Sequence, residues 1–233
     1  MDKTDHSKNQ YVDIVYDEKK KPFTIYPSKL VKYIIKRFKI NKGSKILELG
    51  CGRGEFINEF KKNEMEVTGL DLSYYAKEKF DINVIICDLS NKKVPLEDNS
   101  FDVIFSKSFI EHFYFPEKIF LEANRLLKPE GKFINLTPEW NYIYKNFYED
   151  YTHRTPFTIT SCEDIHSING FKNVKVESFK QLPILWGNGF LTYIFKFLSF
   201  LTRVIIPDSF KKFSRWIKFS KEIMILSYAE KKK

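Results

Sequence analysis

Cysteine is scarce in this chain, with three in 233 residues, and the three are far apart. Cys51, Cys87 and Cys162 show none of the paired spacings that hold zinc, and they do not suggest a disulfide framework. We therefore expect no metal site, and we expect the protein to work in a reducing, cytoplasmic compartment.

Long apolar runs are also lacking. Residues 1–22 are polar and charged, so no secretory signal is expected there. The most apolar stretch, 190–206, is too short and too interrupted by charge for a transmembrane helix. No internal repeat is visible. The composition, 43% hydrophobic and 17% aromatic, is ample for the core of one domain with an insertion or a lid.

Acidic residues are outnumbered by basic ones, and the net charge of +9 raises the question of a nucleic-acid partner. Many of the lysines lie in short runs, at 19–21, 61–62, 92–93, 211–212 and 231–233. Such runs are typical of solvated faces and tails. Charge alone therefore does not favour nucleic acid.

The segment with the most information is Lys45–Phe56, which reads as a buried strand, a glycine turn and the start of a helix. Glycines at 50, 52 and 54 allow a tight turn and let backbone N–H groups approach a ligand closely. Asp71 ends the next apolar run, where an acid at the tip of a second strand would hold a ribose diol. Together these features predict a nucleoside-type cofactor over a parallel sheet.

The glycine spacing distinguishes between cofactors. A dinucleotide fingerprint, G-x-G-x-x-G, would need glycine where Glu55 stands, and a carboxylate is a poor neighbour for a pyrophosphate. Glu48, two residues before the first glycine, instead suggests a cationic ligand end. The E-x-G-x-G-x-G pattern resembles motif I of the class I S-adenosylmethionine (SAM)-dependent methyltransferases. A structural glycine turn and a nicotinamide site of unusual spacing are the alternatives.

Strand and helix patterns alternate along the rest of the chain, which argues for an α/β fold. We expect a Rossmann-like, seven-stranded, doubly wound sheet with helices on both faces and a helical insert before the last strand. The resemblance to the methyltransferases is dense over residues 43–137. The expected strands are 46–49, 67–71, 83–88, 99–106, 132–137, 171–179 and 222–229, and the expected helices include 117–128 and 160–170.

The resemblance implies SAM as the cofactor and assigns its parts to the loops after the first strands. The glycine turn would carry the methionine part, Asp71 the ribose and Asp88 the adenine, with Leu89 packed on the ring. The complete predicted cofactor-binding set is Glu48, Gly50, Cys51, Gly52, Gly54, Asp71, Leu72, Asp88, Leu89 and Ser106.

Substrate chemistry is expected after the fifth strand, at the carboxyl edge of the sheet. Residues 138–158 are dense in aromatic and proton-transferring side chains and are interpreted as a lid. Within it, His153 lies between Asp150 and Arg154 in a loop, where a carboxylate neighbour could hold a histidine as a base. A lid that Asp150 and His153 merely pin in place is the alternative.

Glu111 and His112 follow the fourth strand, and in the resembled family this pair borders the methyl-transfer site. We rank His112 below His153 as proton acceptor. The predicted catalytic residues are His153, Asp150 and His112, and the predicted substrate-binding residues are Glu111, Tyr142 and Arg154, of which Arg154 is equally compatible with a plain surface position.

The resulting expectation is a SAM-dependent methyltransferase that acts by in-line displacement on a small polar acceptor, such as a hydroxyl of a sugar, nucleotide-sugar or lipid-linked glycan. The alternatives are an RNA or protein methyltransferase that uses the basic surface, and a non-catalytic docking module with this fold. Nucleic acid is disfavoured because Ser106–Phe109 replaces the Asn/Asp-Pro-Pro-Tyr/Phe motif of base-amine methyltransferases, and no cysteine fits the nucleophile of the pyrimidine C5 enzymes.

The expected organisation is an N-terminal leader and capping helix over 1–42 and a methyltransferase domain over 43–233, with Tyr11 and Tyr16 as candidate lid aromatics. Residues 182–218 form an amphipathic helical insert, in which 190–206 favours one apolar face. The basic, aromatic segment 210–219 follows. This insert is interpreted as a helical cap over the pocket, a dimer face, or a peripheral contact of 190–219 with the inner face of a membrane.

Overall fold

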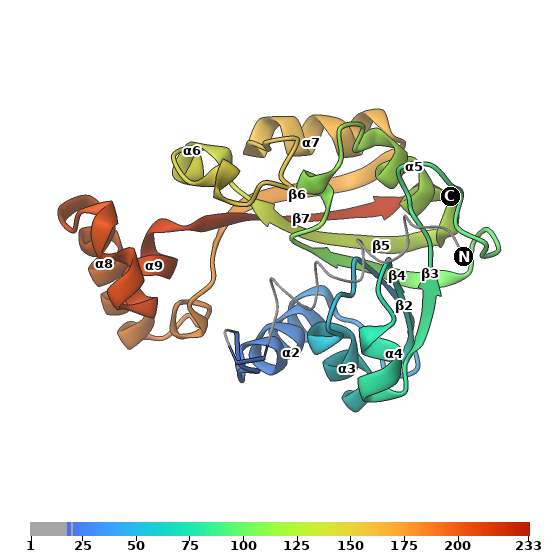
Figure 1. Ribbon diagram of the computed structural model, residues 1–233, viewed down its shortest axis with the longest axis horizontal. Helices are drawn as coiled ribbons and strands as arrows, with labels where there is room; N and C mark the ends of the chain where they lie inside the picture. Colours follow the sequence, from blue (N-terminus) through green and yellow to red (C-terminus); the bar gives the residue numbers. More distant parts are fainter. Residues whose placement is uncertain (1–17, 20) are drawn as a thin grey trace.

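The computed structural model describes residues 18, 19 and 21–233, so the predicted roles of Tyr11 and Tyr16 lie outside the described residues. One sheet of seven strands organises the chain in the order β3-β2-β1-β4-β5-β7-β6 (Figure 1). Strands β1 to β5 pair in parallel, and β7 runs antiparallel between β5 and β6. The strands are β1 Lys45–Leu49, β2 Glu66–Asp71, β3 Asn83–Ile86, β4 Phe101–Lys107, β5 Leu127–Pro138, β6 Phe171–Lys180 and β7 Ile223–Lys231. The predicted α/β class is thus confirmed.

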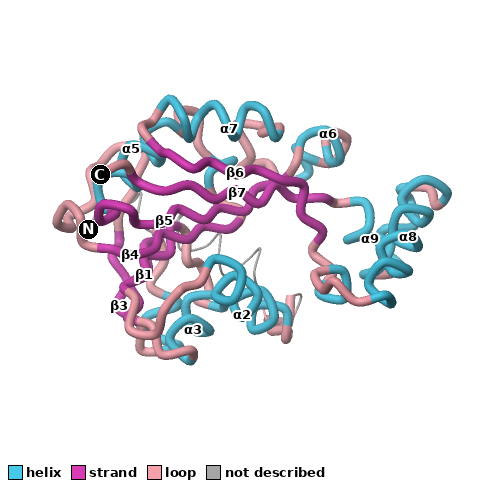
Figure 2. The backbone as a smooth tube through the Cα atoms, turned by 180° about the vertical axis from the view of Figure 1, so that it is seen from behind, coloured by secondary structure: helices cyan, strands magenta, loops and turns pink. Residues whose placement is uncertain are grey.

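Helices cover both faces of the sheet (Figures 1 and 2). On one face, α2 buries Leu30, Val31 and Ile34 completely, in a core shared with the side chains of β1, β4 and β5. On the other face, α5 buries Ile119 and Phe120 in a second core. The covering helices are α2 Tyr26–Phe38, α3 Glu55–Lys62, α4 Tyr75–Phe80, α5 Glu117–Leu126 and α7 Ile159–Ile168. Because both faces are covered, the central strands are apolar runs without alternation.

Several predicted boundaries differ from the structure, most of all in the fifth strand, where β5 begins at Leu127 and was expected to begin at 132. The helix expected over 117–128 ends at Leu126, because Leu127 is fully buried and already pairs with Phe101 of β4. The helix expected from Thr160 begins at Ile159, where the Thr158 side chain accepts from the Ser161 N–H and the Ser161 side chain accepts in return from the Thr158 N–H. This reciprocal cap fixes the start of α7.

The lid, residues 138–158, contains α6 Trp140–Ile143 and the 3-10 turn η2 Phe147–Glu149. Phe147 is fully buried and packs against Trp140, Tyr148 and His153, so the lid has a small core of its own. Its two ends meet where the Trp140 N–H donates to the Phe157 carbonyl at 2.8 Å. The lid therefore folds back over the carboxyl end of β5 as a closed loop.

The insert joins β6 to β7 and extends beyond the sheet at the side opposite the chain's C-terminus (Figure 1). It consists of η3 Pro183–Leu185, α8 Phe190–Ile205, η4 Asp208–Phe213 and α9 Arg215–Lys221. Helices thus lie where the sequence predicted a helical insert. The insert was expected to end at 218, and α9 continues three residues further, to Lys221. In the described part of the chain, no helix has the length and apolar character needed to cross a membrane.

Candidate functional site

The glycine loop after β1 requires backbone conformations that only glycine adopts easily. Gly50 has φ +70°, and a Cβ built there would lie 2.2 Å from Cδ2 of Phe109. Gly52 has φ +48°, and a Cβ there would meet nothing within 4 Å. The Phe109 ring therefore packs against the loop at Gly50, whereas the space beside Gly52 is open. This open space leaves backbone groups accessible to a ligand.

Asp71 ties the glycine loop to the end of β2. Its Oδ2 accepts from the Gly52 N–H at 2.8 Å, and its Oδ1 accepts from the Ser73 N–H at 2.9 Å. Burial raises the pKa of Asp71, while these backbone donors act in the opposite direction. Leu72 follows directly in the chain. The bond to Gly52 places Asp71, the acid predicted to hold the ribose, beside the glycine loop, to which the sequence assigned the methionine part of the cofactor.

Glu48 of β1 is 2% exposed, and its Oε2 has no hydrogen-bond partner within the described residues. Burial, reinforced by the charge of Asp71, raises the pKa of Glu48 well above its ordinary value. A buried carboxylate oxygen without a donor is destabilising unless a ligand supplies one. The site is thus suited to the cationic ammonium end of the cofactor.

Asp88 and Leu89 follow β3, as predicted for the adenine end. Asp88 Oδ1 accepts from the Ser90 N–H at 3.0 Å, and Leu89 is almost fully buried in the core. Cys51 is also buried, and burial raises the pKa of its thiol well above the ordinary value, so it packs rather than reacts.

Ser106, predicted to contact the cofactor, lies inside the sheet. Its side chain is fully buried, and its hydroxyl donates to Asn135 Oδ1 of β5 at 2.7 Å. This bond joins neighbouring strands, and the cofactor contact of Ser106 stays a prediction.

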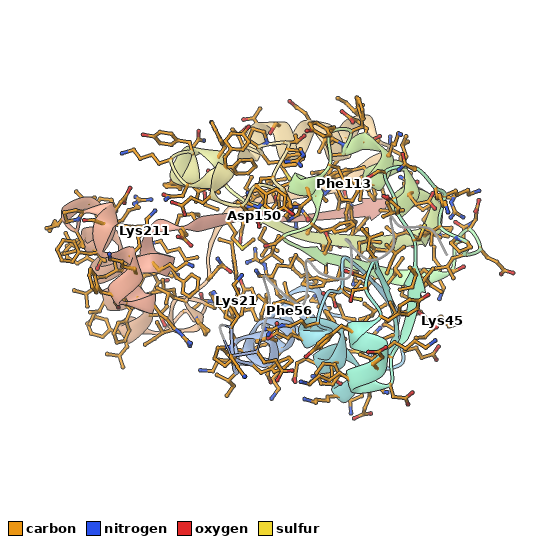
Figure 3. All side chains as sticks on the ribbon, in the orientation of Figure 1. Lys21, Lys45, Phe56, Phe113, Asp150 and Lys211 are labelled. Atoms are coloured by element: carbon orange, nitrogen blue, oxygen red, sulfur yellow. The ribbon has the colours of Figure 1, made fainter. Side chains whose placement is uncertain are left out.

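A pocket of about 480 Å³ lies at the carboxyl edge of the sheet, between the lid, the start of β7 and Lys21. Figure 3 shows Asp150 and Lys21 on either side of this region, with Lys211 of the insert further out. Polar and charged side chains dominate its walls. The lining residues are Lys21, Ser108, Pro138, Ile143, Asn146, Glu149, Asp150, Tyr151, His153, Gln181, Lys218, Glu222, Ile223 and Met224.

His153 lines this pocket, and its protonation pattern follows from its contacts. Its Nδ1 donates to the Phe147 carbonyl at 2.6 Å, because a carbonyl can only accept. In its neutral form the ring therefore carries its lone pair on Nε2. The ring also packs against that of Phe147, with centroids 4.5 Å apart, so the lid core holds it in place.

The structure joins Asp150 to His112, whereas the sequence paired Asp150 with His153. Asp150 Oδ1 accepts from the Thr152 hydroxyl at 2.5 Å, and the Thr152 oxygen in turn accepts from His112 Nδ1 at 2.9 Å. Burial lowers the pKa of His112, which favours its neutral form. The two imidazoles are neighbours, with centroids 4.9 Å apart.

Glu111 is fully buried behind the two histidines. Its Oε2 accepts from the Thr137 hydroxyl at 2.9 Å, and its Oε1 has no partner in the described structure. Burial raises the pKa of Glu111. One ligand atom each from Glu111, His112 and His153 lies within 4.8 Å of the others, so this cluster could also hold a divalent cation, which the sequence did not predict.

Tyr142 and Arg154 lie outside the lining of the pocket. The Tyr142 ring faces the guanidinium of Arg203 of α8, 5.1 Å from its centroid. Arg154 donates to the His153 carbonyl at 2.9 Å and lies over the Tyr114 ring at 5.2 Å. The structure therefore gives both residues contacts within the protein, and their substrate contacts stay predictions.

Two basic residues of the site were missed by sequence reasoning. Lys107, the last residue of β4, has its pKa lowered by burial and lies near the rings of Tyr26 and Phe56, with the charges of Glu111 and Glu48 close by. Arg53, between two of the loop glycines, donates to the Lys21 carbonyl at 2.7 Å. The sequence did contain a signal for these two residues, since Arg53 is a basic residue within the glycine turn and Lys107 is one at the end of the fourth strand. Arg53 holds the segment before α2 against the cofactor loop.

A sheet in this order, with an antiparallel β7 and a glycine loop after β1, defines the class I methyltransferase architecture. Residues 47–135 match the family model described as a methyltransferase domain. An uncharacterized protein of Methanocaldococcus jannaschii is 27% identical over 158 residues, which cover 67% of this chain and 67% of that protein.

Two further similarities are to proteins named as methyltransferases. A sterol 24-C-methyltransferase of Gibberella zeae is 32% identical over 111 residues, covering 43% of this chain and 29% of that protein. Phosphoethanolamine N-methyltransferase 2 of Haemonchus contortus, solved with phosphomonomethylethanolamine and S-adenosylhomocysteine, has a TM-score of 0.63 at 20% identity, over 88% of this chain and 52% of that one. The chain thus spans two thirds or less of these curated relatives. It contains a class I SAM-dependent methyltransferase domain whose cofactor is SAM. The predicted family and the predicted cofactor are thus confirmed.

Proposed function

We propose that the protein transfers a methyl group to a hydroxyl of a small polar acceptor, such as a sugar or a related metabolite, bound in the pocket under the lid. The observation that carries the proposal is the position of His153, which lines that pocket and whose Nδ1 is fixed by the Phe147 carbonyl, so that Nε2 is left as the nitrogen able to accept a proton. A hydroxyl acceptor has to lose a proton, and a histidine in the pocket wall is the side chain that we propose accepts it.

The residues at the glycine loop fit the cofactor, and SAM supplies the electrophilic methyl group when it is bound. Glu48 offers an unpartnered carboxylate oxygen for its ammonium group, Asp71 an acid for the ribose and Asp88 an acid for the adenine. Charged hydrogen bonds of this kind each contribute about 1.5–3 kcal/mol. Lys107 is placed near this end of the site and is a candidate partner for the cofactor's carboxylate.

The remaining contribution of the chain is to hold and align the acceptor. The pocket presents carboxylates of Glu149 and Asp150 and amides of Asn146 and Gln181, a set that can accept from and donate to several hydroxyls at once. Alignment of two reactants supplies roughly 7–11 kcal/mol in favourable cases, and a positioned base adds about 10²–10⁴-fold. Sterol carbon and phosphoethanolamine nitrogen, which the relatives' names give as acceptors, present no comparable array of hydroxyls.

The test is turnover with soluble sugars and nucleotide-sugars, measured as S-adenosylhomocysteine released together with a mass increase of the acceptor. We expect His153→Gln to lower kcat by about 10²–10⁴-fold while SAM affinity is unchanged, because the side chain faces the acceptor pocket. Thr152→Val, which breaks the link between Asp150 and His112, is expected to have a smaller effect.

Turnover measured in the presence of a chelator distinguishes a histidine base from a metal ion bound by Glu111, His112 and His153. We expect turnover to survive EDTA. If EDTA abolished turnover and a divalent cation restored it, the cluster would be a metal site and the proposed base would be wrong. If His153→Ala and His112→Ala each kept full turnover, histidine would not be the proton acceptor.

A further inference from the structure

Helix α8 of the insert is buried on its polar side and exposed on its apolar side. Ser199, the one residue of this helix that is buried, is fully covered; its hydroxyl donates to Ser220 at 3.0 Å and accepts from Lys180 Nζ at 3.1 Å. The opposite side is apolar and open. Its exposed large side chains are Phe190, Leu191, Tyr193, Ile194, Phe197, Leu198, Phe200, Val204 and Ile205, with exposures from 40% to 80%. A helix packed only against its own domain shows the reverse arrangement.

This exposure is built into the fold of the insert. The Trp216 indole N–H of α9 donates to Thr202 Oγ1 at 2.9 Å, and Lys221 Nζ donates to the Arg203 carbonyl at 3.0 Å. Lys221 also pairs with Asp208 at 3.0 Å, with its own side chain 8% exposed. These contacts fix the polar side of α8 against α9 and β6, so the apolar side cannot turn inward. Figure 2 shows the two helices standing clear of the sheet.

The insert that carries the apolar side is strongly basic. Residues 182–221 contain one acid, Asp208, against seven basic residues, Lys196, Arg203, Lys211, Lys212, Arg215, Lys218 and Lys221, a net charge of 7 − 1 = +6. Phe210 and Phe213 of η4 add two more exposed rings beside these cations. Exposed aromatic and aliphatic side chains flanked by lysine and arginine suit the boundary between anionic headgroups and acyl chains.

We propose that the insert docks with α8 flat on an anionic lipid bilayer, its apolar side in the headgroup region and its exposed basic residues Lys212, Arg215 and Lys218 against lipid phosphates. At about 1.5 Å per residue, a 16-residue helix measures about 24 Å, short of the ~30 Å needed to span the hydrocarbon core. A second copy packed on the same face would bring two insert charges of +6 together, which opposes association. A nucleic acid would leave the apolar side chains in water.

Docking of α8 on a bilayer indicates which kind of acceptor is methylated, and this inference rests on the proposed function. Lys218 of α9 and Glu222, which follows α9 directly, also line the acceptor pocket, so the pocket borders the insert that carries the docking surface. A molecule held at the membrane by an acyl or isoprenoid chain would present its polar headgroup beside that pocket. The acceptor is therefore a hydroxyl on a lipid-linked headgroup.

Vesicle co-sedimentation of the full chain tests the docking. We expect binding to vesicles with phosphatidylglycerol and little binding to pure phosphatidylcholine. Phe190→Ser with Phe197→Ser, and separately Lys212→Glu with Arg215→Glu, are each expected to lower the bound fraction at least about tenfold. The matched controls are Leu121→Ser with Ile168→Ser on α5 and α7, and Lys92→Glu with Lys93→Glu, which should bind like the wild type. Equal binding by all variants, or a stable dimer that these substitutions dissolve, would overturn the proposal.

The acceptor is tested separately from the docking. With SAM and an extract of membrane lipids in the vesicles, we expect a methylated lipid from the wild type and at least about tenfold less from the docking variants, which should keep wild-type SAM affinity. Methylation of soluble sugars only, unaffected by these variants, would refute the lipid-linked acceptor and keep the proposed function. Methylation of neither, with SAM bound, would refute both the lipid-linked acceptor and the hydroxyl acceptor proposed above.

Discussion

At the scale of single residues, the site is marked by buried acids that lack a partner. Glu48 and Glu111 are at most 2% exposed, and each has one carboxylate oxygen without a hydrogen bond in the described structure. Leaving such an oxygen unpaired costs free energy in the folded state. Both acids border the loops that follow β1 and β4, where a ligand can supply the missing donors or charge.

Glu48 predicts a pH dependence of cofactor binding. Burial raises its pKa well above the ordinary value in the free protein, and the ammonium group of the cofactor stabilises the ionised form. Binding should therefore release a proton between the pKa of the complex and the pKa of the free protein, and SAM affinity should rise as the pH increases through that window.

Calorimetry in buffers of different ionisation enthalpy measures this proton release. Glu48→Gln should bind SAM at least about tenfold more weakly, the loss of a charged hydrogen bond, and without proton release. Glu59→Gln on α3, whose carboxylate pairs with Lys62, is a control expected to behave like the wild type. Unchanged proton release in Glu48→Gln would show that another group titrates.

At the residue scale, the sequence could place side chains whose position the backbone decides, but not those whose direction depends on tertiary contacts. The glycine loop and Asp71 could be placed from sequence because a strand-turn-helix leaves few positions for them. The direction of Ser106 depends on Asn135, 29 residues away, and that of Tyr142 on Arg203 in the insert. Neither contact has a local sequence signal.

At the scale of elements, the sequence patterns predicted the seven strands well, because a strand buried on both faces must be an apolar run. They also predicted that α8 has an apolar side. They could not predict which side of α8 faces the protein, since that depends on the Lys180, Ser199 and Ser220 contacts between β6, α8 and α9.

Helix α7 predicts how stability depends on acid. His166 is fully buried among Phe120, Phe133 and Phe171, and burial lowers its pKa to about 4. The unfolded histidine titrates near 6.5, so below that pH the unfolded state binds a proton that the folded state excludes. The free energy of unfolding should therefore fall between about pH 6.5 and pH 4, by up to about 3 kcal/mol from this residue.

Denaturant unfolding of the wild type and His166→Leu across this range measures that contribution. Because leucine does not titrate, the variant should lose less stability on acidification, and the two should differ little in slope above pH 7. Parallel curves from pH 7 to pH 4 would mean that His166 is protonated in the folded protein as readily as in the unfolded one.

At the scale of the whole molecule, the residues that match the family model are separate in the chain from the lid and the insert. The family match ends at residue 135, just before the lid, and the insert lies entirely beyond it. The cofactor site thus belongs to the common half of the sheet, whereas the acceptor pocket is made by the lid, by Lys21 and by the junction of the insert with β7. The acceptor therefore has to be argued from this chain's own side chains.

The central claim is that the glycine loop and Asp71 form a working SAM site. Isothermal titration of the full chain with SAM and with S-adenosylhomocysteine, repeated on Asp71→Asn, tests it most directly, with Asp81→Asn at the exposed end of α4 as the matched control. We predict that both ligands bind the wild type and the control, and that Asp71→Asn weakens binding at least about tenfold, as expected for a charged hydrogen bond. No binding by the folded wild type, or equal binding by Asp71→Asn, would contradict the account.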